Sequence, residues 1–247
     1  MAGIGHNPAH VCRVQSARMG QAKVSKVASR TALLAGATGL IGRALLPLLE
    51  TSEAYSLVHV LVRRAVSGIE THPKVSFQTV DFAHLPQPFP KVDDVYIALG
   101  TTIKVAGSEA AFRQVDFDFV VNTARAARAA GARRLAIVSA LGADADSRVF
   151  YNRVKGDMQA SVAGLGYESV VLAQPSLLMG DRAALGQPVR SAEVWATRIF
   201  TPVMWMVPKG IRPIQASAVA SAMLAATLAA KPGLRIMSSA QMQARPR

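Results

Sequence analysis

Three side chains in the middle of the sequence carry groups that can act on a carbonyl or an alcohol: Ser139, Tyr151 and Lys155. Tyr151 and Lys155 are four residues apart, a spacing that places both on one face of a helix. A nearby ammonium group stabilises a phenolate, so such a tyrosine can give a proton to an alkoxide or take one from an alcohol. Ser139 is expected at the end of a strand, where its hydroxyl can hydrogen-bond a carbonyl oxygen. The spacing of Tyr151 and Lys155 alone would also describe an ordinary surface pair.

A glycine-rich turn precedes these residues by about a hundred positions. Its sequence is Gly-Ala-Thr-Gly-Leu-Ile-Gly, and it follows a short apolar run and opens a helical stretch. The first glycine allows a tight turn, the second allows the backbone to approach a pyrophosphate, and the third allows close helix packing. The amino end of the helix then offers N–H groups to the phosphates. The predicted dinucleotide contacts in this turn are Gly36, Thr38, Gly39, Leu40, Ile41 and Gly42.

The type of dinucleotide is indicated by the end of the second apolar run. Proteins that bind NAD place an acidic residue about 20 positions after the glycine turn. This chain has Arg63 and Arg64 there. A guanidinium binds a phosphate in a bidentate pair, whereas a carboxylate would repel it. The sequence therefore predicts NADPH or NADP in preference to NAD, and two solvated surface arginines are the alternative.

Further cofactor contacts are predicted after the third and fourth apolar runs. Asp81, followed by Phe82, could accept a hydrogen bond from an adenine amino group or could cap its own loop. Leu99, Gly100 and Thr101 follow the fourth run, where a glycine allows the backbone to pass near a ribose. A plain turn would explain this glycine as well. Lys155 could hold the nicotinamide ribose.

Short apolar runs alternate with helical stretches from residue 31 onward, which predicts an α/β fold with a doubly wound parallel sheet. We expect a single Rossmann domain over residues 31–240, preceded by a flexible basic arm over 1–30. A small C-terminal substrate-side region includes a less regular segment, 177–214, as a lid. The predicted strands are 32–35, 58–62, 75–80, 94–99, 135–138, 169–173 and 234–237, and the predicted helices are 40–50, 109–130, 151–163 and 215–230.

Composition narrows the class of protein further. The net charge is +13, but no aromatic residues interleave with the basic ones, so we expect no nucleic-acid partner. We also disfavour membrane association, because no apolar run is long enough to span a bilayer. Cys12 is the only cysteine and the histidines lack metal spacing, which predicts a cytoplasmic protein without a metal site. The arm also resembles a transit peptide faintly. We expect a small-molecule substrate of hydrophobic character and a homodimer formed through the long helices.

Taken together, the glycine turn, Asp81, Ser139, Tyr151 and Lys155 resemble the short-chain dehydrogenase/reductase family over about residues 31–237. The stretches 99–102, 104–107, 115–118, 142–144 and 154–156 are similar to the Tat-interacting-protein branch of its atypical members. The resemblance implies NADPH binding and a Ser–Tyr–Lys catalytic set, and it places Pro175 near the nicotinamide. Many members support the active-site lysine with an asparagine, and Asp116 falls near that position here.

Three functions are compatible with these residues. The first is an NADPH-dependent oxidoreductase that transfers hydride to or from a carbonyl or alcohol substrate. The second is a non-catalytic NADPH-binding sensor or regulatory protein. The third is an enzyme similar to nucleotide-sugar epimerases or dehydratases, for which the segment from 177 to 237 is short.

Overall fold

The computed structural model describes residues 1, 29–65, 72–179, 208 and 210–243. Seven parallel strands form one sheet in the order β3-β2-β1-β4-β5-β6-β9. They are β1 (Arg30–Ala35), β2 (Tyr55–Val62), β3 (Val75–Thr79), β4 (Asp94–Ile97), β5 (Arg134–Val138), β6 (Ser169–Gln174) and β9 (Gly233–Ser238). The doubly wound parallel sheet predicted from the sequence is confirmed. The strand order reverses between β1 and β4, where ligands bind in folds of this kind.

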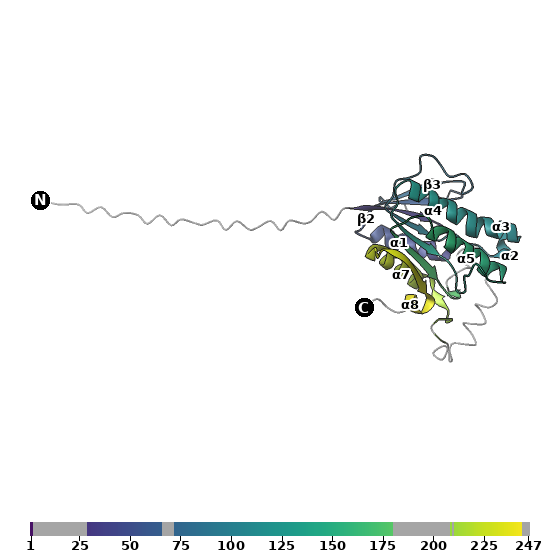
Figure 1. Ribbon diagram of the computed structural model, residues 1–247. Helices are drawn as coiled ribbons and strands as arrows, with labels where there is room; N and C mark the ends of the chain where they lie inside the picture. Colours follow the sequence, from purple (N-terminus) through teal and green to yellow (C-terminus); the bar gives the residue numbers. More distant parts are fainter. Residues whose placement is uncertain (2–28, 66–71, 180–207, 209, 244–247) are drawn as a thin grey trace.

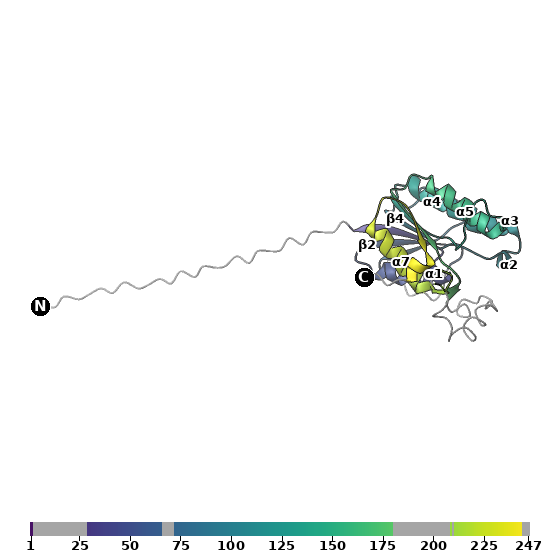
Figure 2. The ribbon, with the colours of Figure 1, turned by 60° about the horizontal axis from the view of Figure 1, so that its bottom comes forward.

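Helices cover both faces of the sheet. Figure 2 shows α4 and α5 on one face and α1 and α7 on the other. The helices are α1 (Leu40–Thr51), α2 (Ile103–Ala106), α3 (Glu109–Arg113), α4 (Phe119–Ala129), α5 (Phe150–Ala163), α7 (Ala216–Ala229) and α8 (Ser239–Gln243). Two short strands, β7 (Leu178–Met179) and β8 (Ile214–Gln215), pair separately from the main sheet. Figure 1 shows α8 beside α7 near the end of the chain.

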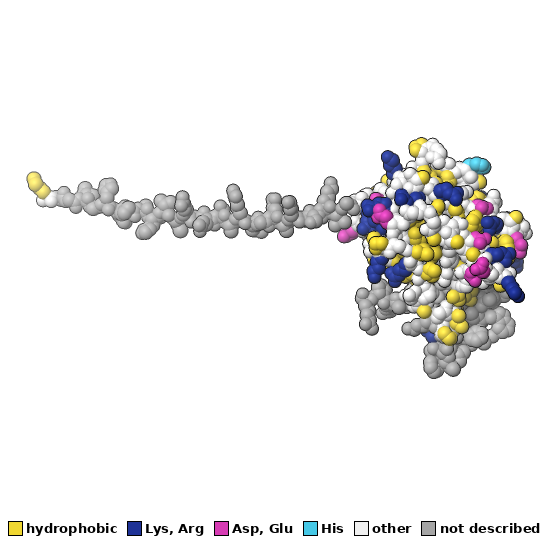
Figure 3. All heavy atoms as spheres, in the orientation of Figure 1, with side chains coloured by type: hydrophobic (Ala, Val, Ile, Leu, Met, Phe, Trp, Pro, Cys, Tyr) yellow, Lys and Arg dark blue, Asp and Glu magenta, His cyan; other side chains and the backbone are white. Residues whose placement is uncertain are grey.

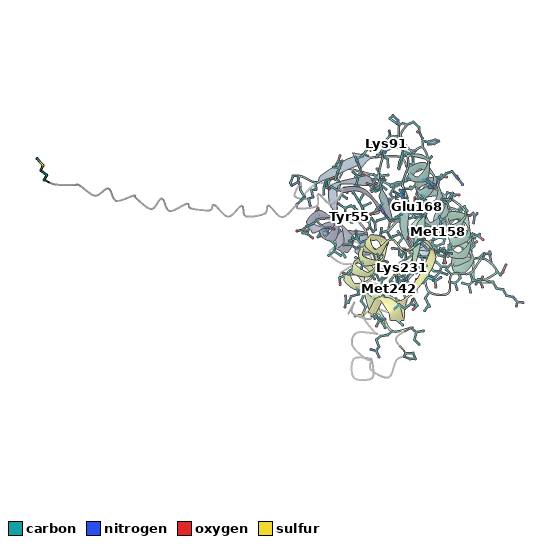
Figure 4. The ribbon with its side chains drawn as sticks, turned by 60° about the vertical axis from the view of Figure 1, so that its left-hand side comes forward. Tyr55, Lys91, Met158, Glu168, Lys231 and Met242 are labelled. Carbon is teal, nitrogen blue, oxygen red and sulfur yellow. The ribbon has the colours of Figure 1, made fainter. Side chains whose placement is uncertain are left out.

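Two hydrophobic clusters fill the space between the sheet and its helices. Alternate residues of the central strands point to opposite faces, so Leu34 packs toward α1 and α7 while Leu33 packs toward α4 and α5. Met158 belongs to the cluster on the face covered by α4 and α5, and Met242 of α8 belongs to the cluster on the opposite face; both are labelled in Figure 4. The central strands β1, β4, β5 and β6 are buried on both sides, as expected for a parallel sheet that is covered twice.

A buried polar cluster joins four strands at their amino-terminal ends. The carboxylate of Asp94 accepts hydrogen bonds from Tyr55 Oη at 2.7 Å, Arg134 Nε at 2.7 Å and Arg30 Nη1 at 3.4 Å. Burial raises the pKa of Asp94, and the hydrogen bond and the two guanidinium charges oppose that rise. The cluster lies at the edge of the sheet opposite the predicted site, so we interpret it as structural.

One long predicted helix has an unexpected interruption. Residues 109–130 are helical almost throughout, but a π-helical turn, η1 (Gln114–Asp118), separates α3 from α4. π-Helical turns inside α-helices often occur at functional sites.

Most of the predicted arm (residues 1–30) and most of the predicted lid (177–214) lie outside the described residues.

Candidate functional site

At two of the three glycines in the turn after β1, a side chain would clash with the backbone of the folded chain. Gly36 has a φ of +93°, and a Cβ there would approach the carbonyl carbon of Ala98 to 2.5 Å. A Cβ on Gly42 would overlap the carbonyl oxygen of Gly36. The tight turn and the close helix packing predicted for these two positions are therefore present.

Gly39 differs from its two neighbours in the turn. A Cβ at this position would lie 3.6 Å from the carbonyl oxygen of Gly36, the nearest atom beyond the two adjacent residues. The φ of Gly39 is −81°. The folded chain therefore has room for alanine here. Gly39 is also the N-cap of α1 and offers no side-chain cap, and the first turn of α1 contains no acidic residue. The turn thus fits a dinucleotide phosphate, which would be the partner that requires a glycine at this position.

We expect Gly39→Ala to lose about 1 kcal/mol of stability at most, because alanine is a poorer N-cap than glycine, but to bind NADPH at least tenfold more weakly, because the added methyl group would occupy the path of the pyrophosphate. Calorimetric titration and urea unfolding of the same preparation measure the two effects. Gly42→Ala is the matched comparison, and we expect it to lose several kcal/mol of stability through overlap with the backbone of Gly36. Equal NADPH affinity in Gly39→Ala and the wild type would contradict this account of the turn.

Arg63 and Arg64 directly follow β2, and both side chains are exposed. The register pairs Leu61 of β2 with Ala35 of β1, so these arginines lie one strand away from the glycine turn. Within the turn, Thr38 is exposed, whereas the side chain of Ile41 is buried in the core and leaves only its backbone for a ligand. The predicted phosphate contacts therefore share one edge of the sheet.

Asp81 caps its own loop, which is the alternative that the sequence left open. Its carboxylate accepts hydrogen bonds from the backbone N–H of Ala83 and pairs with the His84 ring, both at 2.9 Å. The hydrogen bond with His84 lowers the pKa of Asp81. The carboxylate remains 63% exposed, so it can also accept a bond from a ligand. The side chain of Phe82 packs against Phe119 in the core, with ring centroids 5.9 Å apart.

The loop after β4 brings Gly100 and Thr101 against Asp116 of the π-helical turn, and Gly100 also lies near Lys155 of the predicted catalytic helix. The backbone N–H of Thr101 donates to Asp116 Oδ2 at 2.8 Å. A Cβ on Gly100 would lie 3.4 Å from Asp116 Oδ1 and 4.0 Å from Lys155 Nζ. Leu99, just before them, packs partly on the core of the α4 and α5 face.

Lys155 and Asp116 form a buried ion pair. Lys155 Nζ lies 2.7 Å from Asp116 Oδ1, and the two side chains are only 4% and 1% exposed. Asp116 comes from the π-helical turn and Lys155 from α5, so the pair joins these two elements to the loop after β4. The carboxylate of Asp116 therefore contacts the lysine ammonium directly.

Tyr151 lies in the first turn of α5, one turn before Lys155. The tyrosine is half-buried, and its ring packs on Phe112 of α3 with centroids 5.3 Å apart. The absence of a side chain at Gly156 lets α5 approach the backbone of Asp144 and Ala145, and the N–H of Asp144 donates to the carbonyl oxygen of Asn152 at 3.0 Å. The described contacts therefore fix the end of α5 that presents Tyr151.

Ser139 belongs to a hydrogen-bond chain that the sequence did not reveal. Gln174 Nε2 donates to Gln159 Oε1 at 3.2 Å, and Gln159 Nε2 donates to Ser139 Oγ at 2.7 Å. The serine hydrogen can then be donated to a further oxygen. Gln159 lies eight residues after Tyr151, two turns along the same face of α5 and about 12 Å along its axis. That spacing was visible in the sequence, but its partner on the sheet was not.

Pro175 follows β6 and is buried. Its carbonyl oxygen accepts a hydrogen bond from the backbone N–H of Leu141 at 3.0 Å. This contact joins the loop after β6 to the loop between β5 and α5, so Pro175 lies at the same edge of the sheet as Ser139.

The sheet order and the glycine turn at the switch point define a dinucleotide-binding α/β protein. The sequence profile of the NAD(P)H-binding family matches residues 36–172. A relative from Eremothecium gossypii, "Protein FMP52, mitochondrial", is 36% identical over 154 residues, which is 61% of this chain and 67% of the relative. "Protein HTATIP2" from Rattus norvegicus is 31% identical over 179 residues, which is 71% of this chain and 72% of the relative. The chain therefore belongs to the NAD(P)H-binding family, among the atypical short-chain dehydrogenases/reductases.

Solved structures show the same fold at low sequence identity. The Bordetella bronchiseptica enzyme WbmG, in complex with NAD, has a TM-score of 0.62 at 15% identity, covering 88% of this chain and 75% of that one. An oxidoreductase of the short-chain dehydrogenase/reductase family from Burkholderia thailandensis has a TM-score of 0.62 at 18% identity, covering 87% and 94%. These similarities establish the architecture that the sequence predicted.

Two further findings concern metals and membranes. In the part of the chain that the structure describes, no three His, Cys, Asp or Glu side chains gather as a metal site would require. None of the helices within the same residues is long and apolar enough to cross a bilayer.

Proposed function

We propose that this protein is an NADPH-dependent oxidoreductase that acts on a carbonyl or alcohol substrate, with Ser139, Tyr151 and Lys155 at its site. The observation that carries the proposal is the arrangement of α5. This helix presents Tyr151 one turn before Lys155, and the Lys155 ammonium lies close to Gly100 at the carboxyl end of β4. That edge of the sheet also bears the glycine turn, so a reactive group on the protein and a bound dinucleotide would meet there.

Bound NADPH supplies the hydride. Tyr151 is the proton donor to the carbonyl oxygen, and in the reverse direction it takes the proton of the alcohol. Ser139, which accepts from Gln159, donates its hydroxyl hydrogen to the same oxygen. Lys155 is held by Asp116 beside Gly100 and binds the ribose hydroxyls. The remaining cofactor contacts in this proposal are the glycine turn, Asp81, the backbone of Phe82, residues 99–101 and Pro175.

Titration with NADPH and, separately, with NADH tests the cofactor, and a panel of aldehydes and ketones then tests turnover. We expect NADPH to bind more tightly, because Arg63 and Arg64 are exposed beside the glycine turn and can pair with the 2′-phosphate. In the double variant Arg63→Gln/Arg64→Gln, NADPH affinity should fall about 10- to 100-fold, while NADH affinity should change by less than twofold.

Arg235→Gln is the control for general loss of positive charge, since Arg235 is an exposed arginine on the edge strand β9. It should leave the affinities for both cofactors unchanged. A double variant that lost NADPH and NADH equally would show that the two arginines do not select the phosphate.

The second candidate function is a sensor that binds NADPH without turnover. The buried ion pair favours it, because Asp116 already neutralises the Lys155 ammonium. Tight NADPH binding with no oxidation of the cofactor by any carbonyl compound would support this function over the first.

We further propose a cytoplasmic protein with a small-molecule substrate and no nucleic-acid partner, which pairs with a second copy through its long helices. On the face shown in Figure 3, basic side chains are scattered among acidic and hydrophobic ones and form no continuous stripe. Several relatives are named mitochondrial, so cell fractionation should include that compartment.

A further inference from the structure

Large hydrophobic side chains that are exposed gather at the site end of the molecule. Apart from Met1, the described residues include seven of them, and two, Leu234 and Ile236, lie on the edge strand β9. The other five lie in segments that follow the carboxyl ends of β4, β5 and β6. We call these five the apolar rim: Ile103, Val105, Leu141, Val149 and Ile211.

Contacts within the fold tie each part of the apolar rim to the candidate site. Leu141 donates its N–H to Pro175, and the next residue, Gly142, lies against the side chain of Asn152, the neighbour of Tyr151. Val149 is the N-cap of α5, two residues before Tyr151.

The rest of the apolar rim approaches from the loops after β4 and β6. Ile103 and Val105 belong to α2, which begins two residues after the Thr101 N–H that binds Asp116. Ile211 precedes Arg212, whose carbonyl oxygen accepts a hydrogen bond from Ser176, the residue after Pro175. All five residues therefore belong to segments that backbone hydrogen bonds or chain position connect to Tyr151, Lys155 and Pro175.

The side chains of the apolar rim are exposed to solvent although they are aliphatic. Val105, Val149 and Ile211 are about 60% exposed, at 62%, 59% and 60%. Single exposed aliphatic residues are ordinary on a protein surface, but a concentration of them around one site marks a place where apolar surface is covered by a ligand. Polar groups close to the reacting carbon and an apolar surround are also typical of small-molecule sites.

We propose that the apolar rim binds the hydrocarbon body of the substrate, and that the substrates are aldehydes or ketones with an extended aliphatic chain. This inference rests on the proposed function and names its substrate class. The carbonyl group lies at Tyr151, and the chain extends outward over Leu141 and Val149. Each methylene group that the apolar rim covers adds to the affinity, because it leaves water.

Binding of a series of 2-ketones to the protein loaded with NADP tests the proposal without requiring turnover, since neither partner can supply a hydride to the other. The probes are 2-hexanone, 2-octanone and 2-decanone, measured by calorimetric titration. We expect the affinity to rise about fourfold for each added methylene that the apolar rim covers. In the variant Leu141→Ser/Val149→Ser, the increase per methylene should fall to less than 1.5-fold.

Leu234→Ser/Ile236→Ser is the matched control, because it replaces two equally exposed aliphatic residues on the edge strand β9. It should retain the full dependence on chain length. Affinity that does not change with chain length, no binding of any ketone, or an equal loss in the control variant would each overturn the proposal. Failure of the proposed function appears separately, as an absence of NADPH binding or of turnover with every carbonyl compound.

Discussion

Tyr151→Phe should lower turnover of a carbonyl substrate by about a thousandfold while leaving NADPH affinity within about twofold of the wild type. A positioned general acid contributes roughly 100- to 10,000-fold to such a reaction, and phenylalanine has no proton to give. The ring itself is retained, so its packing on Phe112 is preserved. Steady-state rates with a saturating ketone, together with calorimetric titration of NADPH, measure the two quantities.

Tyr167→Phe is the matched control for this substitution. Tyr167 is buried, and its hydroxyl donates to the carbonyl oxygen of Ala124 on the face covered by α4 and α5. Removal of that hydroxyl should cost about 1 kcal/mol of stability and leave the turnover number unchanged. Turnover by Tyr151→Phe at a rate close to that of the wild type would show that another group supplies the proton.

The backbone of the site could be predicted from the sequence because its signals are local. Gly42 is fixed by contacts with Gly36 and Ala37 within its own strand–turn–helix unit, and the positive φ of Gly36 belongs to the turn itself, although a Cβ there would also meet Ala98 from the loop after β4. The alternation of apolar runs with helical stretches likewise fixed the parallel sheet, since parallel strands require helical crossovers. Tyr151 and Lys155 share a helix, and their common face follows from the helical period.

The partners of the site residues could not be predicted in the same way. Gln159 is an ordinary polar residue in a helix until Ser139 and Gln174 are brought to it from two neighbouring strands. The π-helical turn that contains Asp116 left no mark in the apolar spacing of residues 109–130, because one additional residue in one turn hardly alters a helical pattern. Such contacts depend on tertiary packing rather than on local preference.

The ion pair between Asp116 and Lys155 has the largest expected effect on stability. Asp116→Asn should lower the free energy of unfolding by about 3–5 kcal/mol, because it leaves the Lys155 ammonium buried without a countercharge. The asparagine oxygen can still accept the hydrogen bond from Thr101, so the loss would come from the charge rather than from the loop contact. Urea unfolding measures the change, provided that the slope with denaturant stays constant.

A second substitution separates the structural role of this pair from its role in the proposed reaction. Asp116→Asn/Lys155→Met removes both charges and should recover most of the lost stability. Its turnover and its NADPH affinity should be lower than those of the wild type, because the ribose and Tyr151 have lost the ammonium. Asp157→Asn serves as the control, since its pair with Arg113 is 43% and 36% exposed, and such pairs contribute about 0–1 kcal/mol. If Asp116→Asn unfolded within 1 kcal/mol of the wild type, the lysine would have another way to satisfy its charge. Recovery of both stability and turnover in the double variant would instead mean that the pair acts only in holding α5 to the π-helical turn.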